Sequence, residues 1–229
     1  PAFGSRAEFN GFVDFAHSVD MNVILDYVAN HVHEDHPIYK KHPDWATDLY
    51  LPDGSMNIER WDDHRLTTWF DTFLPTLDLS RPEVYSAMTD SAMWWVENSA
   101  VDGFRHDATK HIPEVFWRTL TTKMKVLNRT RGRRLFQIGE TYGSPSLIRS
   151  YISSGMLDAQ FDFNHYDAAV AALAFDEGSF ENLASTARES LKSYGAHNLM
   201  GNITGNQDRI RFTSLADGGV VPEGNGKFE

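Results

Sequence analysis

Strand-length apolar runs alternate with helix-like segments along most of this chain. The apolar runs cover residues 23–28, 102–107, 135–139, 157–163 and 198–203. Helical spacing of the apolar residues between them predicts helices at about 6–19, 82–99, 113–128, from 144 onward, 165–175 and 179–194. A strand–helix alternation of this kind demands a parallel sheet. We therefore predict an α/β fold with five parallel strands, and the continuous run at 23–28 predicts a strand that is buried on both faces.

Acidic segments close several of these apolar runs. They are residues 26–31, 103–111, 138–140 and 205–208. Three carboxylates, Asp107, Glu140 and Asp208, fall where predicted strands end and loops begin. A parallel barrel aims such side chains at one pocket. Two or three carboxylates in one pocket are the equipment for breaking a glycosidic bond.

Residues 32–79 interrupt the alternation. This stretch is rich in His, Asp, Pro and Trp and shows no sustained periodicity, and a loop of this length is usually functional. Ser80-Arg-Pro-Glu83 then resembles a capping box with a proline in the first helical turn. In the helix that follows, we expect Trp94 and Trp95 to be packing residues, and the same holds for Trp117 in the next helix.

Composition limits the classes of partner. The formal net charge is −11, which argues against nucleic acid or an anionic membrane surface and fits a neutral substrate with a bound cation. No stretch approaches the roughly 18 apolar residues of a membrane span. The chain has no cysteine, so disulfides and thiolate metal sites are excluded.

The four acidic segments together resemble conserved regions of the α-amylase family of glycoside hydrolases. The most specific is Gly103-Phe-Arg-His-Asp-Ala-Thr-Lys-His111, and a fifth family region resembles Leu74-Pro-Thr-Leu-Asp-Leu79. The resemblance implies an incomplete (β/α)8 TIM barrel, about strands three to seven, with a long irregular insertion after the third strand. Its barrel parts would be residues 1–31 and 80–229, truncated at both ends, around a small second domain at 32–79. The chain would then be an internal piece of a longer protein.

The resemblance assigns the carboxylates their roles. Asp107 matches the nucleophile that forms a covalent glycosyl-enzyme, Glu140 the general acid/base, and Asp208 a third carboxylate that binds sugar hydroxyls. Glu140 would need a raised pKa to protonate the leaving oxygen. Arg105, two residues before Asp107 on the same side of the strand, can hold that carboxylate ionised. Asp26 matches a structural acid that supports the arginine.

Further positions match substrate-binding residues of the family. His31 matches a histidine that contacts the sugar at the cleavage point. The complete implied set of sugar-contacting residues is His31, Arg105, Lys110, His111, Asn206 and Gln207. The chain departs from the family at Gln207, where the usual motif is Asn-His-Asp. A glutamine amide still donates a hydrogen bond but cannot be cationic, so we expect activity to survive with an altered rate or pH dependence.

The resemblance also implies a calcium site and no organic cofactor. Asn30 and the backbone carbonyl of His111 match Ca²⁺ ligands, and oxygen ligands suit that ion. The loop acids that would complete the site stay open among Asp44, Asp48, Asp53, Asp62, Asp63 and Asp71. A zinc site at His31, His33 and His36 is the less favoured alternative. Two interpretations of Trp45, Trp61 and Trp69 stay open: they stack on sugar rings, or they form the core of the loop.

The leading hypothesis is a retaining hydrolase of α-1,4-glucosidic bonds in starch-like glucans or maltooligosaccharides. One alternative keeps the site but uses a sugar acceptor, as a transglycosylase or branching-type enzyme does. Another is a non-catalytic glucan-binding relative, and a metal-dependent phosphotransfer enzyme on a similar barrel is a more distant one. By family analogy, we expect an enzyme that digests polymeric glucan to act outside the cytoplasm.

Overall fold

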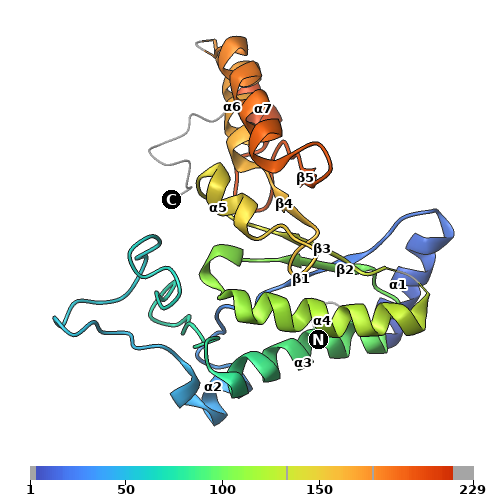
Figure 1. Ribbon diagram of the computed structural model, residues 1–229, viewed down its shortest axis with the longest axis vertical. Helices are drawn as coiled ribbons and strands as arrows, with labels where there is room; N and C mark the ends of the chain where they lie inside the picture. Colours follow the sequence, from blue (N-terminus) through green and yellow to red (C-terminus); the bar gives the residue numbers. More distant parts are fainter. Residues whose placement is uncertain (1–3, 133, 177, 219–229) are drawn as a thin grey trace. The chain divides into compact units, whose positions relative to one another are not determined.

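The computed structural model describes residues 4–132, 134–176 and 178–218. It divides into two compact units, which we describe separately (Figure 1). The first unit comprises Pro1–Glu140 and Ser153–Asp158, and the second comprises Thr141–Ile152 and Ala159–Glu229. The end of the predicted last barrel part, residues 219–229, lies outside the described residues.

The first unit contains three parallel strands with helices between them. The strands are β1 (Ile24–Tyr27), β2 (Gly103–His106) and β3 (Phe136–Gly139), in that order. The helices are α1 (Arg6–Ser18), α3 (Pro82–Asn98) and α4 (Glu114–Arg131). Figure 1 shows α3 and α4 side by side along one face of the strands. The register aligns Asp26 with Arg105 and Arg105 with Ile138, so the three strands end at a common edge.

The helix starts follow local chemistry, with one correction. Helix α1 has a capping box, in which Ser5 Oγ accepts a hydrogen bond from the Glu8 N–H and Glu8 accepts from the Ser5 N–H at 2.7 Å. The capping box predicted at residues 80–83 is wrong. Ser80 instead donates to the Asp78 carboxylate at 2.5 Å, and Arg81 is the N-cap of α3 and pairs with Glu83. The predicted first-turn proline, residue 82, is confirmed.

The core of the first unit lies between the sheet and helices α3 and α4. Phe104, Phe116, Trp117 and Leu120 are fully buried, which confirms Trp117 as a packing residue. Trp94 and Trp95 of α3 pack against α1, where Phe9 meets the Trp95 ring edge-on and the Arg6 guanidinium lies over the Trp94 ring, but their side chains remain 44% and 38% exposed. Helix α3 buries a different face, formed by Val84, Met88, Thr89, Ala92, Met93 and Val96.

Strand β1 also differs from its prediction. Residues 24–27 alternate between exposed and half-buried, whereas a strand buried on both faces was expected. In the first unit, β1 pairs with β2 and lies at the edge of the sheet, so its side chains have neighbours on one side. Its neighbour β2 has three buried residues and one half-buried residue.

The insertion at 32–79 is irregular, as predicted. Its regular elements are α2 (Pro37–Lys41) and a 3₁₀ turn at Pro43–Trp45, joined by isolated bridges such as His31–Thr76 and Ala46–Leu77. Trp69 is buried and its Nε1–H donates to the Thr47 carbonyl at 3.0 Å. Trp69 therefore belongs to the small core of the loop.

The second unit continues the strand–helix alternation. Its parallel strands are β4 (Ala159–Phe161) and β5 (Leu199–Gly201). Its helices are α5 (Pro145–Ser150), α6 (Phe163–Ala174), α7 (Phe180–Tyr194) and α8 (Phe212–Ala216). Helices α6 and α7 lie side by side (Figure 1), and Phe163, Tyr166, Val170, Ile210 and Leu215 form a buried cluster. Helix α8 was not predicted, but the α/β class and all five predicted strands are confirmed.

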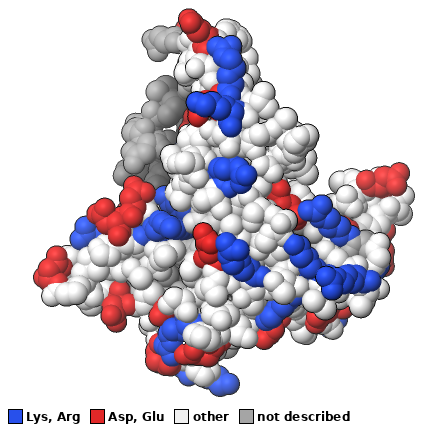
Figure 2. All heavy atoms as spheres, viewed as in Figure 1, with Lys and Arg blue, Asp and Glu red and all other residues white. Residues whose placement is uncertain are grey.

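Side chains of both signs are interspersed over the face seen in Figure 2. None of the described helices combines the length and apolarity that a membrane crossing requires.

Candidate active site

Four of the predicted site residues meet at the carboxyl ends of β1, β2 and β3. Arg105 Nη1 lies 2.8 Å from Asp26 Oδ1 and 2.7 Å from Asp107 Oδ1. Its second terminal nitrogen, Nη2, pairs with the Glu140 carboxylate. The strand register explains this convergence, because Asp26 and Arg105 are direct cross-strand neighbours and Glu140 follows the last residue of β3. One guanidinium therefore holds three carboxylates.

The electrostatics of the cluster centre on Arg105, whose side chain is 11% exposed. Burial by itself would lower the pKa of Arg105, but the negative charges of Glu140 and Asp107 and the hydrogen bonds to Asp107 and Asp26 outweigh it and raise the pKa. The side chain of Glu140 is 8% exposed, so its partner in this geometry is the guanidinium rather than water.

The backbone fixes the two carboxylates relative to each other. The Glu140 N–H donates to the His106 carbonyl at 2.9 Å, and the Thr109 N–H donates to the Glu140 carbonyl at 2.9 Å. Ala108 bends the chain between them with a left-handed φ of 49°. Asp107 is therefore held at the exit of β2 by bonds on both sides of it, which is the rigid support that a site needs.

His31 faces the same edge. Its ring stacks on Phe70 with the centroids 4.4 Å apart. Burial lowers the pKa of His31, and the charge of Asp107 opposes that change. Its buried Nδ1 has no hydrogen-bond partner among the described residues.

Lys110 and His111 form the turn after Asp107, where the insertion contacts them. His111 Nδ1 lies 2.6 Å from the Arg65 carbonyl oxygen, so Nδ1 carries the proton and donates. Burial lowers the pKa of His111 to about 4. Arg65 Nη1 donates to the Lys110 carbonyl at 2.5 Å. The Trp61 ring meets the His111 ring edge-on, with the ring centroids 5.4 Å apart, so Trp61 lies beside the site.

The sequence patterns did not predict a role for two further residues, Arg65 and His106. Arg65 is one of many charged residues in an aperiodic loop, and no pattern marks it. His106 occupies the variable position of the Gly-Phe-Arg-x-Asp motif and is fully buried. Its Nε2 lies 3.0 Å from Gln137 Oε1, and burial lowers the pKa of His106 to about 3. Strand alternation could have identified His106 as facing away from Arg105 and into the helical layer.

The last predicted segment lies in the second unit. Asn206, Gln207 and Asp208 occupy the loop after β5, where Gln207 and Asp208 are exposed. The Asn206 side-chain oxygen accepts a hydrogen bond from the Asp208 N–H at 2.9 Å. The next residue, Arg209, packs over the Tyr142 ring at 4.8 Å. The catalytic role of Asp208 stays a prediction.

The predicted metal ligands present a mixed picture. The Asn30 side chain is fully buried, and neither its oxygen nor its nitrogen has a partner in the described part of the chain. That orphaned amide oxygen fits a Ca²⁺ ligand. Within the described ranges, no three His, Cys, Asp or Glu side chains cluster closely enough to hold a metal. His33 Nδ1 accepts from Asp35 N–H and His36 Nδ1 caps α2, so both act as loop histidines.

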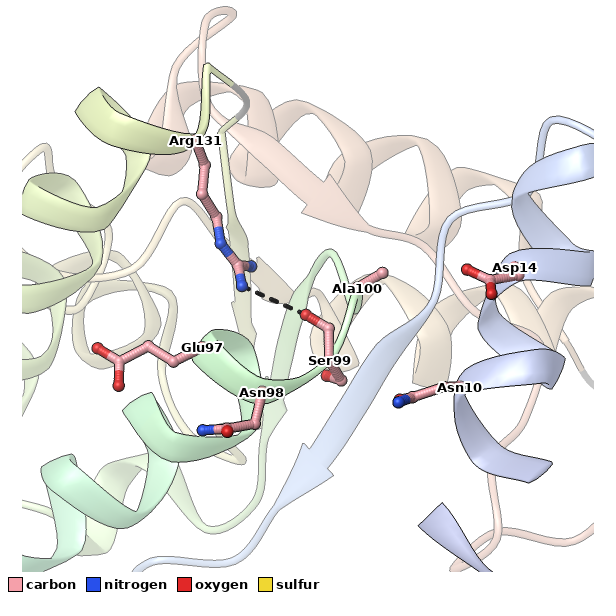
Figure 3. A pocket seen from close by; sticks show the side chains of 7 residues that line it. All are labelled: Asn10, Asp14, Glu97, Asn98, Ser99, Ala100 and Arg131. Atoms are coloured by element: carbon pink, nitrogen blue, oxygen red, sulfur yellow. Dashed lines mark hydrogen bonds between the residues drawn. The ribbon is translucent and has the colours of Figure 1, made fainter. Parts of the chain in front are cut away.

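A hollow of about 450 Å³ lies elsewhere in the first unit. Ser99 and Ala100, which precede β2, line it together with Asn10 and Asp14 of α1. Figure 3 shows Arg131 reaching across to the Ser99 carbonyl, at 3.3 Å. Because Asp107 follows β2, this hollow lies at the opposite end of the strand from the carboxylate cluster.

Comparison with known proteins supports the resemblance. An α-amylase of Streptomyces lividans is 33% identical over 156 residues, which cover 66% of this chain and 16% of that protein. A cyclomaltodextrinase of a Bacillus species is 24% identical over 233 residues, which cover 95% of this chain and 39% of that protein. The crystal structure of an α-amylase from Geobacillus thermoleovorans, complexed with acarbose, has a TM-score of 0.82 and 31% identity over 95% of this chain and 47% of that one.

These relationships confirm the predicted incomplete (β/α)8 barrel. The chain spans less than half the length of these relatives. The family described as "Alpha amylase, catalytic domain" matches residues 1–220. Since that match covers nearly the whole chain and the carboxylate cluster lies at the strand ends where the family motifs predicted it, the chain belongs to the α-amylase catalytic-domain family.

Proposed function

We propose that this chain carries the catalytic centre of a retaining glycoside hydrolase that cleaves α-1,4-glucosidic bonds in starch-like glucans or maltooligosaccharides. The observation that carries the proposal is the shared guanidinium, because Arg105 contacts both Asp107 and Glu140. A retaining mechanism needs a nucleophile and an acid/base about 5–5.5 Å apart. Two carboxylates that bind different nitrogens of one guanidinium lie close to each other.

Each residue then has a defined task. Asp107 attacks the anomeric carbon and forms a glycosyl ester, while Glu140 gives its proton to the leaving oxygen. Water, deprotonated by Glu140, then hydrolyses the ester. Arg105 orients both carboxylates, with Asp26 as its anchor. We propose Asp208 as the third carboxylate, which binds sugar hydroxyls in the distorted ring.

Substitutions in the full-length protein test this assignment. Asp107→Asn and Glu140→Gln should each lower the turnover of starch by at least roughly 10²-fold, and Asp208→Asn should also lower it. Asp35→Asn is a matched control, since Asp35 is an exposed acid paired with Lys40 in the insertion. Wild-type turnover in both Asp107→Asn and Glu140→Gln would refute the proposal. Proton NMR of the first product should show retained α configuration.

Two alternatives predict other experimental outcomes. A transglycosylase or branching-type enzyme would give longer or branched oligosaccharides from the same substrate. A non-catalytic glucan-binding relative would bind maltooligosaccharide without releasing reducing sugar. The Asp107–Arg105–Glu140 cluster favours catalysis, because binding alone does not require a paired nucleophile and acid.

We also propose that the protein binds Ca²⁺ and acts outside the cytoplasm. The buried, unpartnered amide of Asn30 supports the calcium site, and the His111 carbonyl would be a second ligand. The ion would supply structural rigidity between the insertion and the barrel. Export rests on analogy with enzymes that digest polymeric glucan, and fractionation of the native host for starch-degrading activity tests it.

A further inference from the structure

Arg65, in the insertion, is bonded twice to the turn that follows the nucleophile segment. Its guanidinium donates to the Lys110 carbonyl at 2.5 Å, and its own carbonyl accepts from His111 Nδ1 at 2.6 Å. We propose that Arg65 is a positioning residue that holds Lys110 and His111 in the geometry required to bind the sugar chain. This inference rests on the proposed function, which makes those two residues sugar contacts.

The turn needs such external support. Thr109–His111 is a single 3₁₀ turn whose N-cap, Ala108, is left-handed and provides no side-chain cap. Short 3₁₀ turns have poor hydrogen-bond geometry of their own. The first residue of the turn is held by the residue that follows β3, because the Thr109 N–H donates to the Glu140 carbonyl. Arg65 provides the corresponding tie at the other end of the turn.

Aromatic packing makes the contact specific. Trp61 and Phe70 lie on either side of Arg65 in the sequence, and both rings meet the His111 ring edge-on, at 5.4 Å and 5.2 Å. They also contact each other at 4.7 Å. The insertion therefore reaches His111 through a packed segment, residues 61–70, rather than through one extended side chain.

The two bonds act on different parts of the turn. A charge-assisted bond from a guanidinium to a carbonyl is stronger than a neutral one, and it fixes the Lys110 backbone from which that side chain projects. The bond from His111 Nδ1 fixes the ring plane and the tautomer, which leaves Nε2 as the acceptor nitrogen. Asp62 adds little, because it lies 3.7 Å from Lys110 Nζ and is 94% exposed.

The kinetic consequence is a change in substrate affinity. Neither Lys110 nor His111 is one of the reacting groups proposed above, so we expect their sugar contacts to act equally on ground state and transition state. Loss of such uniform binding raises KM and leaves kcat unchanged. We expect Arg65→Ala to raise KM for maltoheptaose roughly tenfold, which corresponds to about 1.4 kcal/mol, with kcat within about twofold of wild type.

Arg81→Ala is the matched control. Arg81 Nη1 also donates to a backbone carbonyl of the insertion, that of Asp44, at 2.5 Å, but its ion pairs are with Asp44 and Glu83. Arg65→Gln is a second variant, because its amide keeps a donor and a similar volume while losing the charge. Hydrogen–deuterium exchange of residues 107–113 provides a readout that is independent of activity.

The experiment on the full-length protein has two decisive results. A tenfold rise in KM at constant kcat, with faster exchange at 107–113, in Arg65→Ala or Arg65→Gln but not in Arg81→Ala supports the proposal. An unchanged KM in the Arg65 variants, or equal losses in the Arg65 and Arg81 variants, overturns it.

Failure of the proposed function would be seen separately, in the wild type. If wild-type protein releases no reducing sugar, the hydrolase assignment fails. The dissociation constant of maltoheptaose, measured by calorimetry, then replaces KM in the same comparison and decides the role of Arg65.

Discussion

Replacing Arg105 with Met should destabilise the full-length protein, and the loss should depend on pH. Arg105 contacts three carboxylates, those of Asp26, Asp107 and Glu140. Removing one partner of a buried ion pair costs about 3–5 kcal/mol. We expect the lower end, about 3 kcal/mol at pH 7, because Asp26 is half exposed and solvent screens its charge. Met keeps an unbranched side chain in the space of the arginine stem.

The pH dependence follows from the charges that remain. In the variant, ionised carboxylates face one another without a cation, and protonation relieves their repulsion. The cost should therefore shrink as the pH falls towards about 4, where carboxyl groups begin to protonate. Thermal unfolding should show a fall in Tm of roughly 3–6 °C at pH 7, because the shift per kcal/mol decreases with chain length, and less than half of that at pH 4.

A surface ion pair provides the control for this prediction. Arg134 pairs with Asp158, but its side chain is 78% exposed, so Arg134→Met should cost at most about 1 kcal/mol. An Arg105→Met variant that loses the same Tm at both pH values would refute the electrostatic reasoning. A loss of Tm in Arg105→Met that is no larger than the loss in Arg134→Met would refute it as well.

Three further predictions concern backbone, core and metal. Gly103→Ala should cost about 3 kcal/mol in urea unfolding, because φ is +148° and the new Cβ would lie 1.8 Å from the Phe136 carbonyl oxygen; Gly132→Ala, with a φ of +69° but nothing within 4 Å, should cost clearly less. His106 has a folded-state pKa of about 3 against 6.5 for the free side chain, so the unfolded state binds its proton first and stability falls as the pH drops from about 6.5 to 3. Between pH 7 and pH 4, the unfolding free energy of His106→Gln should fall by less than that of wild type. An equal fall would contradict the low folded-state pKa of His106. EDTA should lower the Tm of wild type, Ca²⁺ but not Mg²⁺ should restore it, and Asn30→Ala should respond to neither; a wild type that ignores EDTA rules out the calcium proposal.

The fold was predictable because its determinants are local. Period-two and period-3.6 patterns place strands and helices without knowledge of the neighbours, and all five predicted strands occur. The errors arose where neighbours decide. The apolar run at 24–27 forms an edge strand rather than a buried one, and the tryptophans at 94 and 95, which pack against α1, stay partly exposed.

The site was predictable to the extent that its residues follow strands. Parallel strands end at one edge, so Asp26, Asp107 and Glu140 could be expected to meet, and Arg105 was expected beside Asp107. The contact of Arg105 with Glu140 was not foreseen, since it depends on the stagger between β2 and β3. Arg65 was missed because its role arises from how an aperiodic loop packs.

The sequence alone determined the order of strands and helices, the family motifs and the positions of the candidate carboxylates, because periodicity and residue identity act over a few neighbouring residues. Tertiary structure decided which groups share a guanidinium, which tautomer His111 adopts and which loop residue supports it. Those features depend on distances between segments far apart in the chain, and hydrogen bonds and ion pairs vary steeply with such distances.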